Sequence, residues 1–211
     1  MTLRQAMWLA LHDFYENSWR LVVVNAALGA ALVVAVLATL AEPVALVLVI
    51  ATGPVVAALV HCAVTLVRTG DLTFADAFDG LRLHWRRGLA LAGAGAASLG
   101  LGLLALRFYS GAALWPLAFL TLYLLVFLAI FELVLWTVAI AAPHRPLAAV
   151  VRESVALAAA RPGQTFVLGL ALLLVNVAGI AAAVMPFLTL TVVYTFLVTA
   201  RFLVTPEEEA A

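Results

Sequence analysis

Six long apolar stretches, separated by short polar segments, constrain what this chain can fold into. They cover residues 21–40, 44–67, 89–106, 114–142, 166–185 and 187–204. A helix of roughly 20 apolar residues crosses the hydrocarbon core of a bilayer, which is about 30 Å thick. The sequence therefore predicts an all-α, polytopic membrane bundle of six transmembrane helices, with residues 1–211 forming a single membrane domain.

Composition supports this class and excludes others. The 211 residues are 67% apolar and 10% charged, whereas a soluble domain is about 45–50% apolar and about 25% charged. The formal net charge is zero, so no general attraction to phosphate exists and a nucleic-acid-binding protein is excluded. A single cysteine excludes a disulfide framework.

The boundary between the fifth and sixth stretches consists of Pro186 alone. Together the two stretches hold about 39 residues, which is too long for one tilted span. A proline inside a helix removes a backbone hydrogen bond and clashes with the preceding turn. The sequence therefore favours a tight hairpin between two spans over one kinked helix.

Three amphipathic segments, 2–19, 74–87 and 147–160, alternate with the spans. Apolar residues recur at helical spacing in the first two segments and form their apolar stripes: Leu3, Met7, Leu11 and Phe14, then Phe74, Phe78, Leu81 and Trp85. Thr73 and Asp76 have the spacing of a capping box. All three segments are predicted to be helices at the cytoplasmic interface or under the bundle, with docking of a partner as the alternative.

Arginine predicts the orientation. With six spans, ten of the 11 basic residues fall on the side that holds both termini, and Arg107 alone falls on the other side. The positive-inside rule then places both termini in the cytoplasm. The order of amphipathic helix, span and span occurs three times, over 1–70, 71–143 and 144–211, which predicts a three-fold parallel repeat.

Glu132 is the sharpest candidate for a functional residue, because it lies well inside the fourth span. A charge at mid-membrane costs roughly 2.5–3.5 kcal/mol on insertion scales, so the carboxyl group is expected to face the bundle and be protonated or paired. His61 of the second span is the expected partner. A proton or solute site and a structural hydrogen bond between two helices both fit this pattern.

The second span also contains Thr52, Gly53 and Pro54, which predict a kink or a short unwound segment. Such breaks line binding sites in transporters and also occur as packing kinks. Four further polar residues in the spans are expected to line a cavity or to bond across helices: Asn25, Asn176, Tyr194 and Thr195.

Motifs for catalysis or cofactor binding are absent from the sequence. It contains no phosphate-binding loop, since it has no lysine, and no His-Glu-x-x-His, Gly-x-Ser-x-Gly or metal-spaced Cys/His pattern. The sequence therefore predicts a protein that is not an enzyme and has no cofactor or metal.

Asn25 in the first span and the run from Thr52-Gly53-Pro54 to Leu59 resemble the YesL-like bacterial membrane proteins, a domain family of unknown function. The resemblance extends through the basic stretch at Arg68 and the aromatic segment 74–87, and covers residues 10–90. Members are linked with carbohydrate uptake. The resemblance implies an accessory role there and supplies no catalytic residues.

The leading hypothesis is a non-enzymatic protein of the bacterial inner membrane that assists or regulates solute uptake, plausibly of sugars. Its expected partners are the lipid bilayer and a membrane protein such as a sugar transporter. The alternative is a small transporter or channel whose polar site is formed by Glu132, His61 and the break at Thr52-Gly53-Pro54.

Overall fold

The computed structural model describes residues 3–42, 47–181 and 190–204. Its elements are the helices α1 Leu3–Glu16, α2 Ser18–Ala41, α3 Val47–Ala51, α4 Gly53–Thr69, α5 Phe74–Gly111, α6 Trp115–Ala141, α7 Leu147–Ala160, α8 Pro162–Ala181 and α9 Val192–Leu203. Five helical stretches are long and apolar enough to cross a membrane, namely α2, α3 with α4, α5, α6 and α8. The all-α class is confirmed, and five of the six predicted spans have helices of the required length and hydropathy.

The sixth predicted span, 187–204, is described only from residue 190 onwards, where α9 provides 12 helical residues. The predicted hairpin at Pro186 lies outside the described residues. The division of 166–204 into two spans therefore stays a prediction.

Helix α5 differs from the expected arrangement. The amphipathic segment 74–87 and the span 89–106 form one continuous helix of 38 residues, which is about 57 Å long at 1.5 Å per residue. It begins at the predicted capping box, where the Thr73 amide donates to Asp76 Oδ2 over 2.6 Å. Segment 74–87 and the span 89–106 were predicted as separate elements. Arginine has a high helix propensity, and Gly88 packs closely against α4, so the helix continues through the polar residues.

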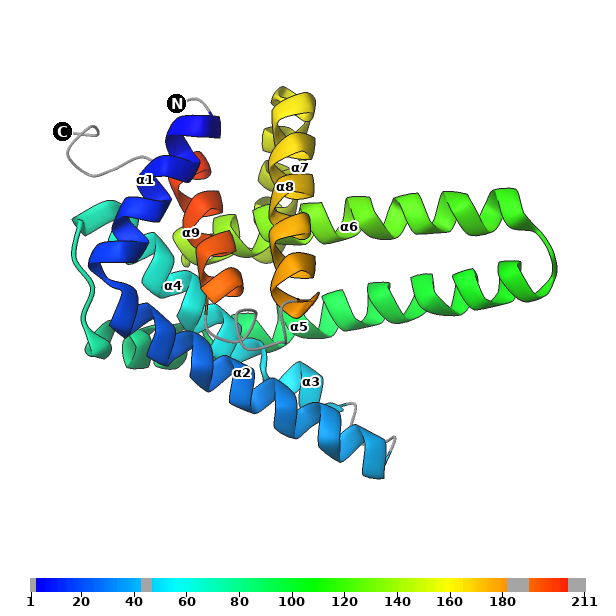
Figure 1. Ribbon diagram of the computed structural model, residues 1–211, viewed down its shortest axis with the longest axis horizontal. Helices are drawn as coiled ribbons and strands as arrows, with labels where there is room; N and C mark the ends of the chain where they lie inside the picture. The colour runs from blue at the N-terminus through cyan, green and yellow to red at the C-terminus, as the bar shows by residue number, and fades with distance from the viewer. Residues whose placement is uncertain (1–2, 43–46, 182–189, 205–211) are drawn as a thin grey trace.

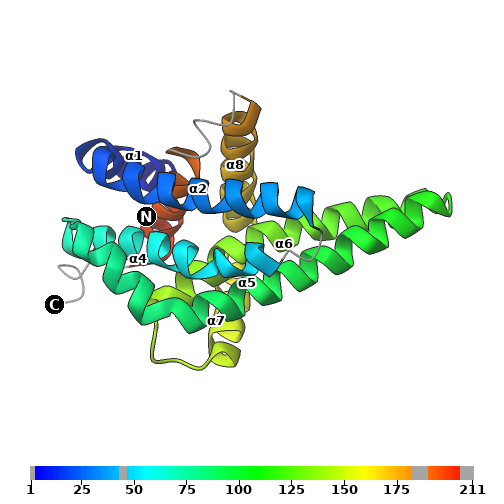
Figure 2. The ribbon, with the colours of Figure 1, turned by 90° about the horizontal axis from the view of Figure 1, so that it is seen from below.

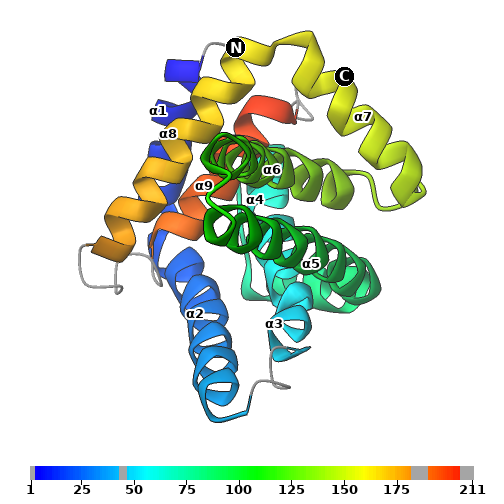
Figure 3. The same ribbon diagram turned by 90° about the vertical axis from the view of Figure 1, so that its right-hand side faces the viewer.

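The other helices gather around one end of a long hairpin that α5 and α6 form. Helices α5 and α6 run side by side and antiparallel, and their far halves project from the rest of the molecule (Figure 1). Helix α4 lies along the first half of α5, and α1 lies beside α9, while α8 crosses α6 (Figure 2). Figure 3, which looks along the hairpin, shows α2, α7 and α8 leaving it in different directions. The three-fold repeat stays a prediction.

The core lies where α4, the second half of α6, α9 and one face of α2 meet. The projecting halves of α5 and α6 instead expose large apolar side chains, among them Leu101, Leu104, Phe108, Phe119, Tyr123 and Phe127. A soluble protein rarely exposes so large a continuous apolar surface. Such a surface is compatible with contact to the hydrocarbon core of a membrane.

The buried positions of the first two amphipathic segments are small or polar residues. In α1 they are Ala6, Ala10 and Asp13, while Met7 and Phe14 of the apolar stripe are half-buried against the core and Leu11 is exposed. In the first half of α5 the buried positions are Gly80, His84 and Gly88, and all four residues of the expected stripe, Phe74, Phe78, Leu81 and Trp85, are exposed. Small residues allow helix backbones to approach closely, which accounts for the small residues at the buried positions.

Glycines set the spacing between α5 and its neighbours. A Cβ atom added to Gly88 would lie 2.7 Å from the Gly53 carbonyl oxygen, and one added to Gly80 would lie 2.8 Å from His61 Cβ. Farther along α5, Gly95 faces the Glu132 carboxyl group and Gly102 faces Leu125. Helix α5 therefore contacts α4 through its first two close-packed glycines and α6 through the next two.

The Gly53–Gly88 contact predicts the effect of two matched substitutions. Gly88→Ala forces the α4 and α5 backbones apart, and we expect it to lower the free energy of unfolding by about 1–3 kcal/mol. Gly100→Ala, where an added Cβ would meet nothing within 4 Å, should raise it by about 1 kcal/mol through helix propensity. Denaturation of both variants in detergent, followed by circular dichroism, tests the difference. Equal effects would contradict the close contact.

Candidate functional site

The predicted break in the second span is present at Thr52, between α3 and α4. The Thr52 hydroxyl donates to the Val49 carbonyl over 2.7 Å, and Pro54 occupies the first turn of α4. Gly53 lies directly against Gly88 of α5. The break is thus filled by the backbone of a neighbouring helix, which is the packing alternative that the sequence left open.

His61 of α4 contacts His84 of α5. His61 Nδ1 and His84 Nε2 are 3.3 Å apart, and the His61 ring lies over Gly80. A hydrogen bond between two imidazole nitrogens requires one to carry a proton and the other a lone pair. His84 is buried, so the two histidines form a polar contact inside the α4–α5 interface.

Glu132 of α6 has a different environment. Its carboxyl group faces Gly95 of α5, where an added Cβ would lie 3.4 Å from Oε1. Trp136 lies one turn farther along α6, on the same face of the helix. Gly95 therefore allows the carboxyl group to approach the α5 backbone.

The predicted pairing of Glu132 with His61 is wrong. The two residues contact α5 at Gly95 and Gly80, which are 15 positions apart and therefore about 22 Å apart along the helix. The Gly53 contact at Gly88 lies between these two levels. The three parts of the predicted polar site are thus spread along α5 instead of meeting at one point.

The other predicted polar residues bond between or within helices. Asn176 Nδ2 of α8 donates to Thr195 Oγ1 of α9 over 2.7 Å, and Thr195 donates in turn to the Thr191 carbonyl, also over 2.7 Å. The Tyr194 hydroxyl donates to the Met7 carbonyl of α1 over 3.2 Å. Asn25 is buried in α2. These contacts tie α9 to α8 and α1.

Two arginines form a cluster that the sequence did not reveal. Arg87 Nη1 donates to the carbonyls of Ala139 and Ala142 over 2.8 and 2.9 Å, and Arg68 Nη2 donates to Ala141 over 2.9 Å. The last carbonyls of a helix have no partner within it and carry partial negative charge. Arg68 and Arg87 therefore cap the C-terminal end of α6.

A second missed contact joins the first and last helices. Arg201 of α9 donates twice to the Asp13 carboxylate of α1, over 2.6 and 2.8 Å. The two side chains are only 16% and 12% exposed. Removing one partner would leave a poorly solvated charge. In the sequence, Asp13 follows Ala6 and Ala10 at helical spacing, on the same face of its segment. That position was the signal that could have pointed to a buried partner for Asp13.

Within the described part of the chain, no group of three or more His, Cys, Asp or Glu residues lies close enough to hold a metal ion. No family model, curated protein or solved structure matches the chain. The geometry of the described residues therefore carries the functional argument.

The α6 cap predicts unequal effects for two neighbouring arginines. Arg87→Gln leaves carbonyls at the end of α6 unpaired, and we expect it to lower the free energy of unfolding by about 1–3 kcal/mol. Arg86 is exposed and lies over the Trp85 ring at 5.0 Å, so Arg86→Gln should change it by no more than about 0.5 kcal/mol. Chemical denaturation in detergent compares the two variants, and a cost as large for Arg86→Gln would argue against the cap.

Proposed function

We propose that the chain is a polytopic protein of a bacterial inner membrane that assists or regulates solute uptake without catalysing a reaction. The observation that carries this proposal is the way its intramembrane polar groups are used. Thr52, Asn176 and Thr195 all donate to groups within the protein. Satisfying polar groups internally gives a rigid scaffold and leaves few of them to bind a solute.

The dimensions of α5 support its insertion in a membrane. Arg87 and Arg107 are 20 residues apart on this helix, a rise of about 30 Å that equals the thickness of the hydrocarbon core. Arg87 is near the cap of α6, and Arg107 is near the tip of the hairpin. The positive-inside rule then favours the arginine-rich end in the cytoplasm.

The resemblance to YesL-like proteins favours sugars as the solute and a sugar transporter as the partner. The exposed apolar surface of the α5–α6 hairpin provides area for such a membrane-embedded contact. None of the contacts described above identifies a sugar transporter as the partner. The proposed role is therefore tested by measuring sugar uptake.

Uptake of radiolabelled mono- and disaccharides should fall severalfold in cells that lack the chain, with transporter abundance unchanged. Expression of the full chain should restore it, while the purified chain alone in phospholipid vesicles should carry no flux. Unchanged uptake for every sugar in the panel would reject the role. Flux through the purified chain would favour the second candidate.

That second candidate is a small transporter, and the position of Glu132 is the observation that favours it. Gly95, which faces Glu132, lies eight positions after Arg87 on α5. The carboxyl group is therefore about 12 Å deeper along α5 than Arg87. A carboxyl at this depth is expensive and is often functional.

If the chain itself transports a solute with protons, Glu132→Gln should abolish flux in reconstituted vesicles while leaving the fold intact, because glutamine has nearly the same size and shape as glutamate and cannot carry the proton. A Gly100→Ala variant serves as the control within the same hairpin. Flux that is equal in the wild type and in Glu132→Gln would reject proton coupling at this residue.

A further inference from the structure

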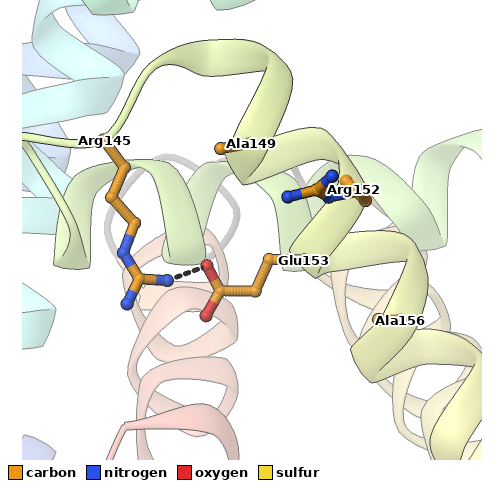
Figure 4. A pocket seen from close by; sticks show the side chains of 5 residues that line it. All are labelled: Arg145, Ala149, Arg152, Glu153 and Ala156. Atoms are coloured by element: carbon orange, nitrogen blue, oxygen red, sulfur yellow. Dashed lines mark hydrogen bonds and ion pairs between the residues drawn. The ribbon is translucent and has the colours of Figure 1, made fainter.

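The surface beside the α6–α7 turn contains a hollow that the proposed function does not use. It has a volume of 440 Å³ and is lined by Arg145, Ala149, Arg152, Glu153 and Ala156 (Figure 4). The four residues from α7 recur at helical spacing and so share one face of that helix. The two alanines leave room between the charged side chains.

The charges in this hollow do not cancel. Arg145 forms an ion pair with Glu153, and Figure 4 shows Arg152 beside that pair. Two guanidinium groups and one carboxylate leave a net positive charge on the lining. Both arginines are exposed, so an anion reaches them without any rearrangement of the fold.

Arg87, which caps the C-terminal end of α6, also fixes the backbone at the edge of the hollow. Arg87, which caps Ala139 and Ala142, also donates to the carbonyl of Arg145 through Nη2. The backbone that carries Arg145 is therefore fixed to α5, and Arg87 adds another positive charge near the turn. A preorganised cationic site loses less entropy when it binds an anion.

We propose that this hollow binds a phosphate group, carried by an anionic phospholipid or free in solution. The planar fork of a guanidinium matches phosphate oxygens in charge and geometry. Exposed apolar residues of the same helix, Val151, Val155 and Leu157, provide contacts for acyl chains next to a headgroup. The site is independent of the uptake role and would remain if that role were rejected.

The lipid arm of the test uses the full chain in phosphatidylcholine vesicles with spin-labelled phosphatidylglycerol as the probe. The protein should enrich phosphatidylglycerol over an equally labelled phosphatidylcholine. Arg152→Gln should lower this enrichment about fivefold, the usual worth of one basic residue near an anionic surface. Glu153→Gln should raise it, because it removes the negative charge of the lining.

Arg82→Gln is the matched control, since it removes an exposed arginine of α5 outside the hollow. The second arm titrates inorganic phosphate into the detergent-solubilised chain and its variants by calorimetry. Binding that depends on Arg152 in this arm, with no lipid enrichment, identifies free phosphate as the source. No binding in either arm, or equal losses for Arg152→Gln and Arg82→Gln, would overturn the proposal.

Discussion

The close approach of α4 and α5 at Gly53 and Gly88 determines how the other parts of the molecule meet. Because no side chain separates the two backbones there, His84 reaches His61 one turn before the contact. Arg87, the residue next to Gly88, reaches the carbonyl end of α6. One contact between two glycines thus fixes the positions of a histidine pair and a helix cap.

The inward faces of α1 and of the first half of α5 consist of small and polar residues. In water, an amphipathic helix buries its large apolar residues. Here Phe78 and Leu11 point outwards and Gly80 and Ala10 point inwards. Small residues let two helix backbones approach closely, and polar contacts add to this packing, so these contacts decide which face turns inwards. The same reasoning accounts for buried His84 and Asp13 in these helices.

The sequence predicted features that depend on local or periodic information. Apolar length identified the spans, Thr73 and Asp76 identified the start of α5, and Thr52-Gly53-Pro54 identified the break before α4. Which glycines would make contact was not predictable, because Gly95 and Gly102 face α6 while Gly100 meets nothing. That distinction depends on the neighbouring helix.

Long-range partners were the part that sequence reasoning could not supply. The sequence prediction paired Glu132 with His61 because both are ionisable and lie within apolar stretches. That criterion contains no information on how deep each residue lies in the bundle. Depth along α5 separates them, and His61 contacts His84 instead. The continuous helix through Gly88 decided this outcome, because it made segment 74–87 a packing partner for α4.

The distribution of charge distinguishes two kinds of arginine at the end of the molecule that holds the α6 cap. Arg68, Arg87 and Arg201 donate to carbonyls or to a carboxylate within the protein and so contribute to the fold. Arg152 is exposed on α7 beside the ion pair of Arg145 with Glu153. The positive-inside rule counts both kinds equally. Arginines of the first kind therefore stabilise the fold, whereas an exposed arginine such as Arg152 is the kind that the proposed phosphate site requires.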